Sequence, residues 1–257
     1  MTPAGLSRLK ELGITTLFDL RSVPELQRKG PEWEGVEVHA NGGPFYTRPT
    51  EQDAEPQPSP SSSSTQAPTR GDAPERIWTP VFKETDYSPA AIAERYRNYA
   101  TTDSTAGFVA AYRTILQHAG PAYRTIIAHL CAPDPSPVLV HCTAGKDRTG
   151  VLVALLFLLC GVTAETVAEE YALTDLGLGH RKEEFRERLL RHDALRGNEV
   201  GVERMIASRA ENMRDTIVMI RDEFGGAEGY VRNSLGFTGE EVEMLRRNLI
   251  VRERAVL

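Results

Sequence analysis

A β-prone run, a tight loop and an apolar helix follow one another between residues 138 and 160, and this junction constrains the fold most. Residues 138–140 (Val-Leu-Val) predict a buried strand after a proline-rich turn, and the apolar run at 151–160 predicts a buried helix that begins at Thr149. A loop that ends a strand and opens a helix directs backbone N–H groups and the positive end of the helix dipole at one point. The junction therefore predicts an anion-binding cradle at the edge of a sheet.

The loop between this strand and this helix holds a thiol and a guanidinium group six positions apart. Cys142 lies at the rim of the predicted cradle, where the backbone dipoles favour a thiolate. Arg148 carries a planar fork that matches two phosphate oxygens, and Gly145 allows the backbone to turn inward. An inert buried cysteine and a surface arginine would also fit the spacing, but they do not explain the whole string in a strand–loop–helix context.

The string HCTAGKDRTG at residues 141–150 resembles the Cys-X5-Arg signature of the cysteine-dependent protein tyrosine phosphatase superfamily. Its filler residues are similar to those of a fungal and bacterial branch with mycobacterial members. LFDLRS at 17–22, YALT at 171–174 and GGAEGY at 225–230 resemble that branch more weakly. The resemblance implies that Cys142 forms a cysteinyl-phosphate without a metal or an organic cofactor. It also implies that the phosphate is bound by the loop residues Thr143, Ala144, Gly145, Lys146, Asp147 and Arg148.

The same resemblance points to a general acid. Asp147 occupies the loop position of the candidate acid in that branch, although an ion pair with Lys146 is an alternative role. The Trp-Pro-Asp segment of other members of the superfamily is absent from the sequence. Asp103 and Asp134 are further candidates for the general acid, because both precede Cys142 in predicted loops.

Further side chains are expected to support the loop. Thr149 would donate its hydroxyl to the cysteine sulfur, or would cap the helix instead. His141 would orient the loop, or would fill a core position at the strand end. Asp19 and Arg21 lie at the end of another predicted strand, at 14–20, and a parallel sheet brings such ends to one edge. Arg21 would then line the pocket or pair with Asp19.

Three classes of function remain open. The first is a phosphomonoesterase that acts on phosphotyrosine in proteins and that, as a dual-specificity enzyme, would also act on phosphoserine and phosphothreonine. Lys146 matches one of two loop lysines in tensin-homologue lipid phosphatases and Thr143 replaces the other, so a phosphoinositide substrate also stays open. The second class is a phosphate-binding pseudophosphatase, and the intact Cys142 and Arg148 argue against it. The third is a rhodanese-type sulfurtransferase, whose loop lacks the Arg-Thr-Gly ending.

The order of elements predicts an α/β fold with a central, mostly parallel sheet flanked by helices, phosphatase-like, with a large helical C-terminal part. Strands are expected at 14–20, 36–39 and 138–140. Helices are expected at 6–12, from 88 onward, and at 104–118, 121–130, 149–160, 164–173, 182–191, 200–224, 227–234 and 239–251. Thr238 predicts a capping box for the last of them. The charged run at 181–184 predicts a solvated helix face.

Residues 50–74 have a different composition from the rest of the chain. They are rich in proline and serine and contain almost no large apolar side chain, which predicts a disordered insertion. The chain is otherwise expected to be one tyrosine-phosphatase-like domain over residues 1–257. The resembled branch has a few dozen further residues before the strand at 14–20, so the chain is expected to be either a natural short form or one whose start is misassigned. Loss of an edge hairpin would expose the sheet, at a cost to stability or activity.

Composition argues against several other kinds of protein. The net charge of −6 does not favour nucleic acid as a partner. The three cysteines show no metal-binding spacing and no disulfide framework, which favours a reducing, cytoplasmic location. The sequence shows no signal peptide and no apolar run long enough for an integral membrane segment.

Overall fold

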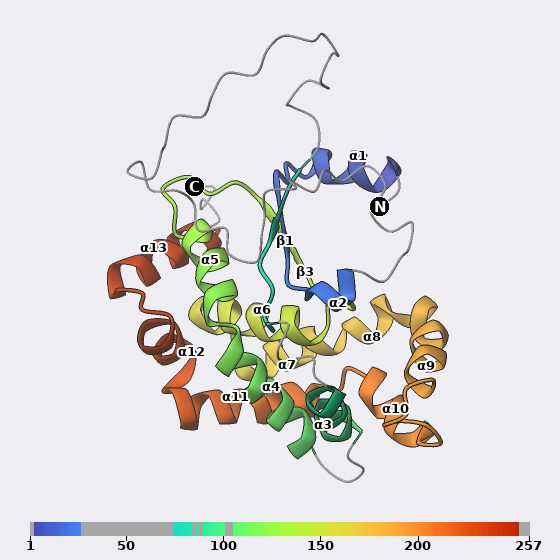
Figure 1. The fold of residues 1–257 in the computed structure, drawn as a ribbon. Coiled ribbons are helices and arrows are strands. Elements are labelled where there is room, and N and C mark those ends of the chain that lie inside the picture. Colours follow the sequence, from blue (N-terminus) through green and yellow to red (C-terminus); the bar gives the residue numbers. More distant parts are fainter. Residues whose placement is uncertain (1–2, 27–73, 84–85, 87–88, 101–104, 252–257) are drawn as a thin grey trace, which may run out of the picture.

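The described residues form one small parallel sheet. The computed structural model describes residues 3–26, 74–83, 86, 89–100 and 105–251. Within them, three strands pair in the order β2-β1-β3, formed by Glu75–Trp78, Thr16–Asp19 and Val138–His141, and helices flank them (Figure 1). The expected α/β class with a mostly parallel sheet is confirmed. The strand expected at 36–39, and the insertion at 50–74 apart from Pro74, lie outside the described residues.

β1 is the central strand and is buried along its whole length, which is why it does not alternate between apolar and polar residues. Asp19, at its end, is in register with Trp78 of β2 and His141 of β3. Parallel pairing therefore brings the carboxyl ends of the three strands together, as expected for Asp19 and His141. The short helix α2 (Val23–Leu26) lies at this end of the sheet (Figure 1).

The sequence pattern does not predict β2. This strand is held against β1 by polar contacts with residues far away in the sequence. Its four residues, Glu-Arg-Ile-Trp, form neither an apolar run nor a strict alternation. Arg76 is nevertheless buried, because its guanidinium pairs with Asp19 of the neighbouring strand. Trp78 Nε1 also donates a hydrogen bond to the Arg21 carbonyl at 2.6 Å. A strand that is weak by local pattern thus becomes stable through its partners.

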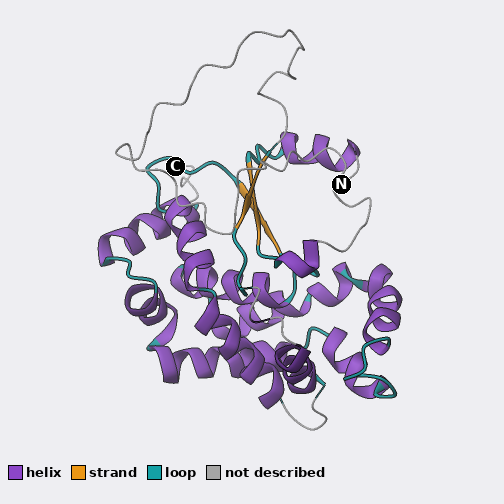
Figure 2. Ribbon diagram, in the orientation of Figure 1, coloured by secondary structure: helices purple, strands orange, loops and turns teal. Residues whose placement is uncertain are grey.

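Helices make up most of the described chain (Figure 2). Before β3 they are α1 (Pro3–Glu11), α2, α3 (Pro89–Tyr99), α4 (Ala106–His118) and α5 (Gly120–Leu130). After β3 they are α6 (Asp147–Leu159), α7 (Ala164–Ala172), α8 (Thr174–Gly177), α9 (Lys182–Leu190), α10 (Glu199–Ile206), α11 (Ala210–Phe224), α12 (Gly226–Gly229) and α13 (Gly239–Leu249). A 3-10 turn covers Gly179–Arg181 and a π-helical turn covers Tyr230–Ser234. The large helical C-terminal part and the capping box at Thr238 are confirmed.

The single helix expected at 200–224 is wrong. The chain leaves the helical conformation at Ala207, whose ψ is 145°, and α11 begins three residues later. Two contacts from distant residues fix this break. The Ser208 amide donates to Asp175 Oδ1 at 2.7 Å, and the Lys146 ammonium donates to two carbonyls at the end of α10. Those carbonyls would otherwise accept hydrogen bonds within a continuous helix.

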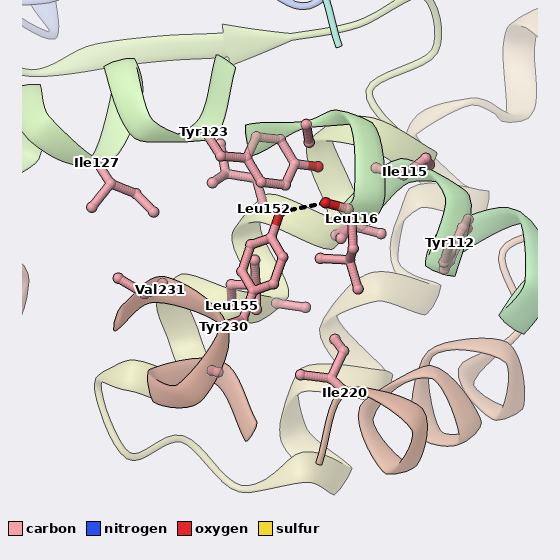
Figure 3. Close-up of a cluster of buried hydrophobic side chains, with 14 of the residues drawn as sticks. Tyr112, Ile115, Leu116, Tyr123, Ile127, Leu152, Leu155, Ile220, Tyr230 and Val231 are labelled. Atoms are coloured by element: carbon pink, nitrogen blue, oxygen red, sulfur yellow. Dashed lines mark hydrogen bonds between the residues drawn. The ribbon is translucent and has the colours of Figure 1, made fainter. Parts of the chain in front are cut away.

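The main hydrophobic core anchors α6. Leu152 and Leu155 are fully buried, and they lie among side chains of α4, α5 and the segment after α11 (Figure 3). Complete burial of one such leucine contributes about 1.5–3 kcal/mol. Since α6 carries no polar face that must remain in water, its position is set by packing on nearly every side. The loop that opens α6 is therefore built on a rigid element.

Candidate active site

The loop between β3 and α6 places Cys142 at the first turn of the helix. Gly145 has a φ of +69°, a left-handed conformation that favours glycine, and it turns the chain from the strand into the helix. The helix begins at Asp147, two residues earlier than the sequence predicts. Cys142, which is 6% exposed, therefore shares one site with the positive end of a 13-residue helix.

Arg148, in the first turn of α6, is held by Glu25 of α2. Its Nη1 and Nη2 atoms donate to different carboxylate oxygens of Glu25, each at 2.7 Å, and form a bidentate ion pair. Nη1 also donates to the Leu20 carbonyl and Nη2 to the Thr143 hydroxyl, both at 3.3 Å. The Thr143 hydroxyl in turn donates to Glu25. These contacts fix the guanidinium in the wall of the pocket that Cys142 also lines.

Glu25 is a site residue that the sequence analysis missed. Burial raises the pKa of its carboxyl group, but the hydrogen bonds and charge of Arg148 outweigh burial and hold that pKa well below its usual range. Ser22 donates to the same carboxylate from its amide at 3.0 Å and from its hydroxyl at 2.8 Å. The string SVPE at 22–25 is a capping signal that would have located this helical turn. It contains nothing that identifies a partner 123 residues away.

Asp147 contacts the protein interior through one oxygen and also lines the pocket. Its Oδ1 accepts a hydrogen bond from the Tyr112 hydroxyl at 2.8 Å and lies 3.4 Å from the Lys146 ammonium. The ion pair anticipated as its alternative role is therefore present. The side chain nevertheless remains one-quarter exposed, at 25%, so a substrate in the pocket can reach it.

The Lys146 ammonium is enclosed by protein groups. The side chain is only 4% exposed, and Nζ donates to the Met205 carbonyl at 2.5 Å. Nζ also lies 4.9 Å from the centre of the Phe108 ring, within the range of a cation–π contact. Lys146 thus joins the loop to the end of α10, and much of its charge is neutralised within the protein.

Thr149 does not cap α6, because the N-cap residue is Lys146, which makes no side-chain cap bond. The Thr149 hydroxyl is buried and, within the described part of the chain, has no hydrogen-bond partner. Of the two further candidates for the general acid, Asp134 is exposed in the turn before β3, at the opposite end of that strand from Cys142. Asp103 lies outside the described residues.

Arg21 is found in the second of its two expected roles, as an ion-pair partner of Asp19. Asp19 is fully buried and accepts hydrogen bonds from the guanidinium groups of Arg21, at 3.0 Å, and Arg76, at 3.0 Å. His141 Nε2 lies 3.8 Å from the same carboxylate. Burial raises the pKa of Asp19, but Arg21 and His141 bring it below its ordinary value. Burial lowers the pKa of His141 despite the nearby carboxylate. The contacts of Asp19 with Arg21, Arg76 and His141 thus link the ends of the three strands beneath the loop.

An apolar chamber of about 430 Å³ opens on the loop. Loop residues, including Cys142 and Arg148, line one side of it. The other walls come from α3 and the α8–α10 region, with the apolar and aromatic side chains Ile92, Tyr96, Tyr99, Leu178, Phe185, Leu189, Met205 and Ile206. Arg95, Arg188 and His192 lie among them. The helix expected at 182–191 therefore has one face in the wall of the pocket, and the charged run at 181–184 is not among the lining residues.

The other two cysteines are not among the residues that line the chamber. Burial raises the pKa of the Cys131 thiol to about 11, and it also raises the pKa of Cys160. All three cysteines are free. Across the described ranges, no three His, Cys, Asp or Glu side chains gather in a way that suits a metal ion. None of the helices in those ranges is both long enough and apolar enough to span a bilayer.

Known proteins are similar in sequence to this chain. A tyrosine-protein phosphatase from Nostoc commune is 32% identical over 154 residues, which cover 54% of this chain and 48% of that relative, about half its length. The triple specificity protein phosphatase PtpB of Mycobacterium tuberculosis is 26% identical over 258 residues, which cover 96% of this chain and 86% of the relative. A model of the tyrosine phosphatase family matches residues 1–251. Since that match covers nearly the whole sequence, the chain belongs to the tyrosine phosphatase family.

Proposed function

We propose that the chain is a phosphomonoesterase that removes phosphate from phosphotyrosine in proteins through a cysteinyl-phosphate. The observation that carries the proposal is the common pocket of Cys142 and Arg148 at the start of α6, with the Arg148 fork fixed by Glu25. A nucleophilic sulfur, an oriented guanidinium and a helix N-terminus together suit the transfer of a phosphoryl group to sulfur.

In the first step, the Cys142 thiolate attacks phosphorus, so that an S–P bond forms and the P–O bond to the ester oxygen breaks. Asp147 gives its proton to the leaving oxygen and becomes a carboxylate. In the second step, water attacks phosphorus and passes a proton to Asp147 while the S–P bond breaks. The products are inorganic phosphate and the regenerated thiolate.

Other loop groups stabilise both steps. Arg148 and the amides of residues 143–148 bind the phosphoryl oxygens, whose negative charge grows in the transition state. The Thr149 hydroxyl supplies a hydrogen bond to the departing sulfur in the second step, and the lack of another partner for it among the described residues supports that role. His141 and the Asp19–Arg21 pair hold the strand ends from which the loop departs.

The chamber favours an aromatic phosphate ester as substrate. Its walls are largely apolar and aromatic, which suits the ring of phosphotyrosine. The names of the two relatives, a tyrosine-protein phosphatase and a triple specificity protein phosphatase, support the same substrate and a wider range of esters. Lys146 is the residue that left a phosphoinositide substrate open, and its ammonium is already engaged by the Met205 carbonyl and the Phe108 ring. We therefore place protein substrates before lipids.

We also propose that the chain acts as one domain in a reducing cytoplasm. One hydrophobic cluster extends from Phe18 in β1 to Leu245 in α13, which supports a single folding unit. The free state of the three cysteines supports a compartment in which Cys142 stays a thiol.

Hydrolysis of a phosphotyrosine peptide in the presence of EDTA tests the function. We expect Cys142→Ser to abolish turnover and Arg148→Lys to lower kcat/KM by about 10²-fold or more. Cys131→Ser removes a partly buried thiol outside the chamber and should retain turnover. A folded wild-type protein that binds phosphate without hydrolysing the peptide would instead indicate a pseudophosphatase.

A further inference from the structure

Two buried tyrosine hydroxyls form a chain that ends on Asp147. Tyr112 of α4 is completely buried, and its hydroxyl donates to Asp147 Oδ1 at 2.8 Å. The hydroxyl of Tyr171, in α7, lies 2.6 Å from the Tyr112 hydroxyl. A phenol has one proton to donate, and Tyr112 uses it toward Asp147. Tyr171 must therefore donate to Tyr112, so the chain of donors runs from Tyr171 through Tyr112 to Asp147.

The tyrosine chain reaches only one of the two carboxylate oxygens. The Lys146 ammonium, at 3.4 Å, also contacts Oδ1. Among the described residues, no hydrogen bond or ion pair reaches Asp147 Oδ2. A carboxyl group whose Oδ1 accepts the Tyr112 proton and lies beside the Lys146 ammonium carries its own proton on Oδ2. Because the Asp147 side chain lines the pocket, Oδ2 is the oxygen left to face a substrate.

We propose that Tyr112, supported by Tyr171, is a positioning residue that orients Asp147 so that Oδ2 delivers its proton to the leaving oxygen. This inference rests on the proposed function and on Asp147 as its general acid. It gives a role in the reaction to two side chains that lie outside the signature loop, on α4 and α7. Gly150 makes room for Tyr171, because a Cβ at that position would lie 3.2 Å from the Tyr171 ring.

Both tyrosines remain donors throughout the working range of pH. Burial is the main reason that the pKa of Tyr112 lies well above its ordinary value, and the charge of Asp147 adds to the effect. The same two causes, in the same order, raise the pKa of Tyr171. Consecutive hydrogen bonds in a buried site also polarise one another, which strengthens the final bond to Asp147.

The test compares two esters that differ in their need for an acid. Phenyl phosphate releases a basic phenolate and depends on protonation of the leaving oxygen, whereas 4-nitrophenyl phosphate releases a weaker base and depends on it far less. In Tyr112→Phe we expect kcat/KM for phenyl phosphate to fall about tenfold, and that for the nitrophenyl ester to change less than about twofold. Tyr171→Phe keeps the Tyr112 donation and should show a smaller loss with the same selectivity.

Two further variants separate positioning from stability. Tyr230→Phe is the matched control, because Tyr230 is equally buried in the same core and its hydroxyl donates to the Leu116 carbonyl at 2.7 Å (Figure 3). This variant should leave the ratio of the two kcat/KM values unchanged. The double variant Tyr112→Phe/Asp147→Asn should be no slower on phenyl phosphate than Asp147→Asn alone, since the two residues act through one proton.

An equal loss on both esters in Tyr112→Phe would give Tyr112 a merely structural role and overturn the inference. An Asp147→Asn variant with the wild-type ratio of kcat/KM values would also overturn it, while Cys142-dependent turnover would leave the proposed phosphatase function standing. Failure of the function itself looks different, because a folded wild-type protein would then hydrolyse neither ester, and both proposals would fall.

Discussion

Glu25 and Arg148 form a buried pair in which each charge depends on the other. Their side chains are 9% and 12% exposed, so neither charge is well solvated without its partner. Removing one member of such a pair is far more harmful than breaking a surface ion pair, because the remaining charge stays buried. The orientation of the phosphate-binding guanidinium is thus set by a residue on another element, far away in the sequence.

We expect Glu25→Gln to lower the free energy of unfolding by about 3 kcal/mol. It should also lower kcat/KM for a phosphotyrosine peptide about tenfold, because the Arg148 fork loses its fixed plane. Urea unfolding and steady-state kinetics measure the two effects. Glu165→Gln, which breaks the exposed pair between Glu165 and Arg214, should change neither. Equal stability of both variants would contradict this account of the buried pair.

Acidification should destabilise the protein through Glu25 of α2 and through Asp19 and His141 at the strand ends. Folding lowers the pKa of Glu25 and of Asp19 below their ordinary values of 4.5 and 3.8, so their stabilising effect is present above those values and is lost as the pH falls. Folding also lowers the pKa of His141 from 6.5, so protonation of the unfolded chain below that pH favours unfolding. Urea titrations at about pH 7, 5.5 and 4 should show a progressive fall, less steep at the acid end in Glu25→Gln. Stability that increases toward pH 4 would rule out this linkage.

At the scale of the elements, α6 and α7 pack closely where Gly150 of α6 faces the Tyr171 ring of α7. Gly150 lies in the second turn of α6, and a Cβ there would lie 3.2 and 3.3 Å from two atoms of the Tyr171 ring. Tyr171 is buried and its hydroxyl is held by Tyr112, so the ring cannot move aside without lengthening that contact. The glycine after Arg148 and Thr149 therefore sets how closely the two helices pack.

Gly150→Ala should gain helix propensity worth about 1 kcal/mol and lose a similar or larger amount to crowding, so that its stability does not rise. Gly177→Ala is the comparison, because Gly177 is also helical and has no atom near its missing Cβ. That variant should be slightly more stable than wild type. Thermal unfolding of the three proteins measures the difference, and a clear stabilisation by Gly150→Ala would show that the ring yields freely.

At the level of elements, the sequence predicts local structure well and long-range contacts poorly. The strand–loop–helix junction at Cys142 has apolar periodicity and a glycine turn, so its geometry follows from neighbouring residues. β2 and the break between α10 and α11 depend on charges from Asp19, Lys146 and Asp175, which no local pattern reveals. For the same reason, Glu25 and Tyr112 were missed although each contacts a loop residue that the sequence identifies.

At the scale of the whole molecule, the part of the chamber wall that α9 and α10 form packs around a separate hydrophobic cluster. Phe185, Leu195, Val202 and Ile206 form a second hydrophobic cluster, separate from the one that anchors α6. α9 and α10 are therefore attached to the rest of the chain by fewer buried contacts than the helices around α6. Such a unit opens at a lower free energy than the main core.

Leu195→Ala, at a residue that is 1% exposed, should loosen this unit selectively. We expect a local cost of about 2–5 kcal/mol and faster amide hydrogen exchange in α9 and α10, with little change in α4 and α6. Hydrogen-exchange mass spectrometry measures both regions in one experiment. A matched loss of protection in α6 would show that the two clusters unfold together.

The contacts that β1 and α2 make lie far apart in the sequence, and this affects the order in which the chain folds during synthesis. Asp19 meets Arg76 only 57 residues later in the sequence, and Glu25 meets Arg148 only after a further long stretch, 123 residues from its own position. Contacts of such sequence separation form slowly, while the helices behind α6 depend more on neighbours. On the ribosome, β1 and β2 are made well before β3 and α6, so Glu25 has no Arg148 to pair with until α6 has emerged and can pack against the helices that follow it. The ability to bind a phosphate should then arise near the end of synthesis, in one cooperative step.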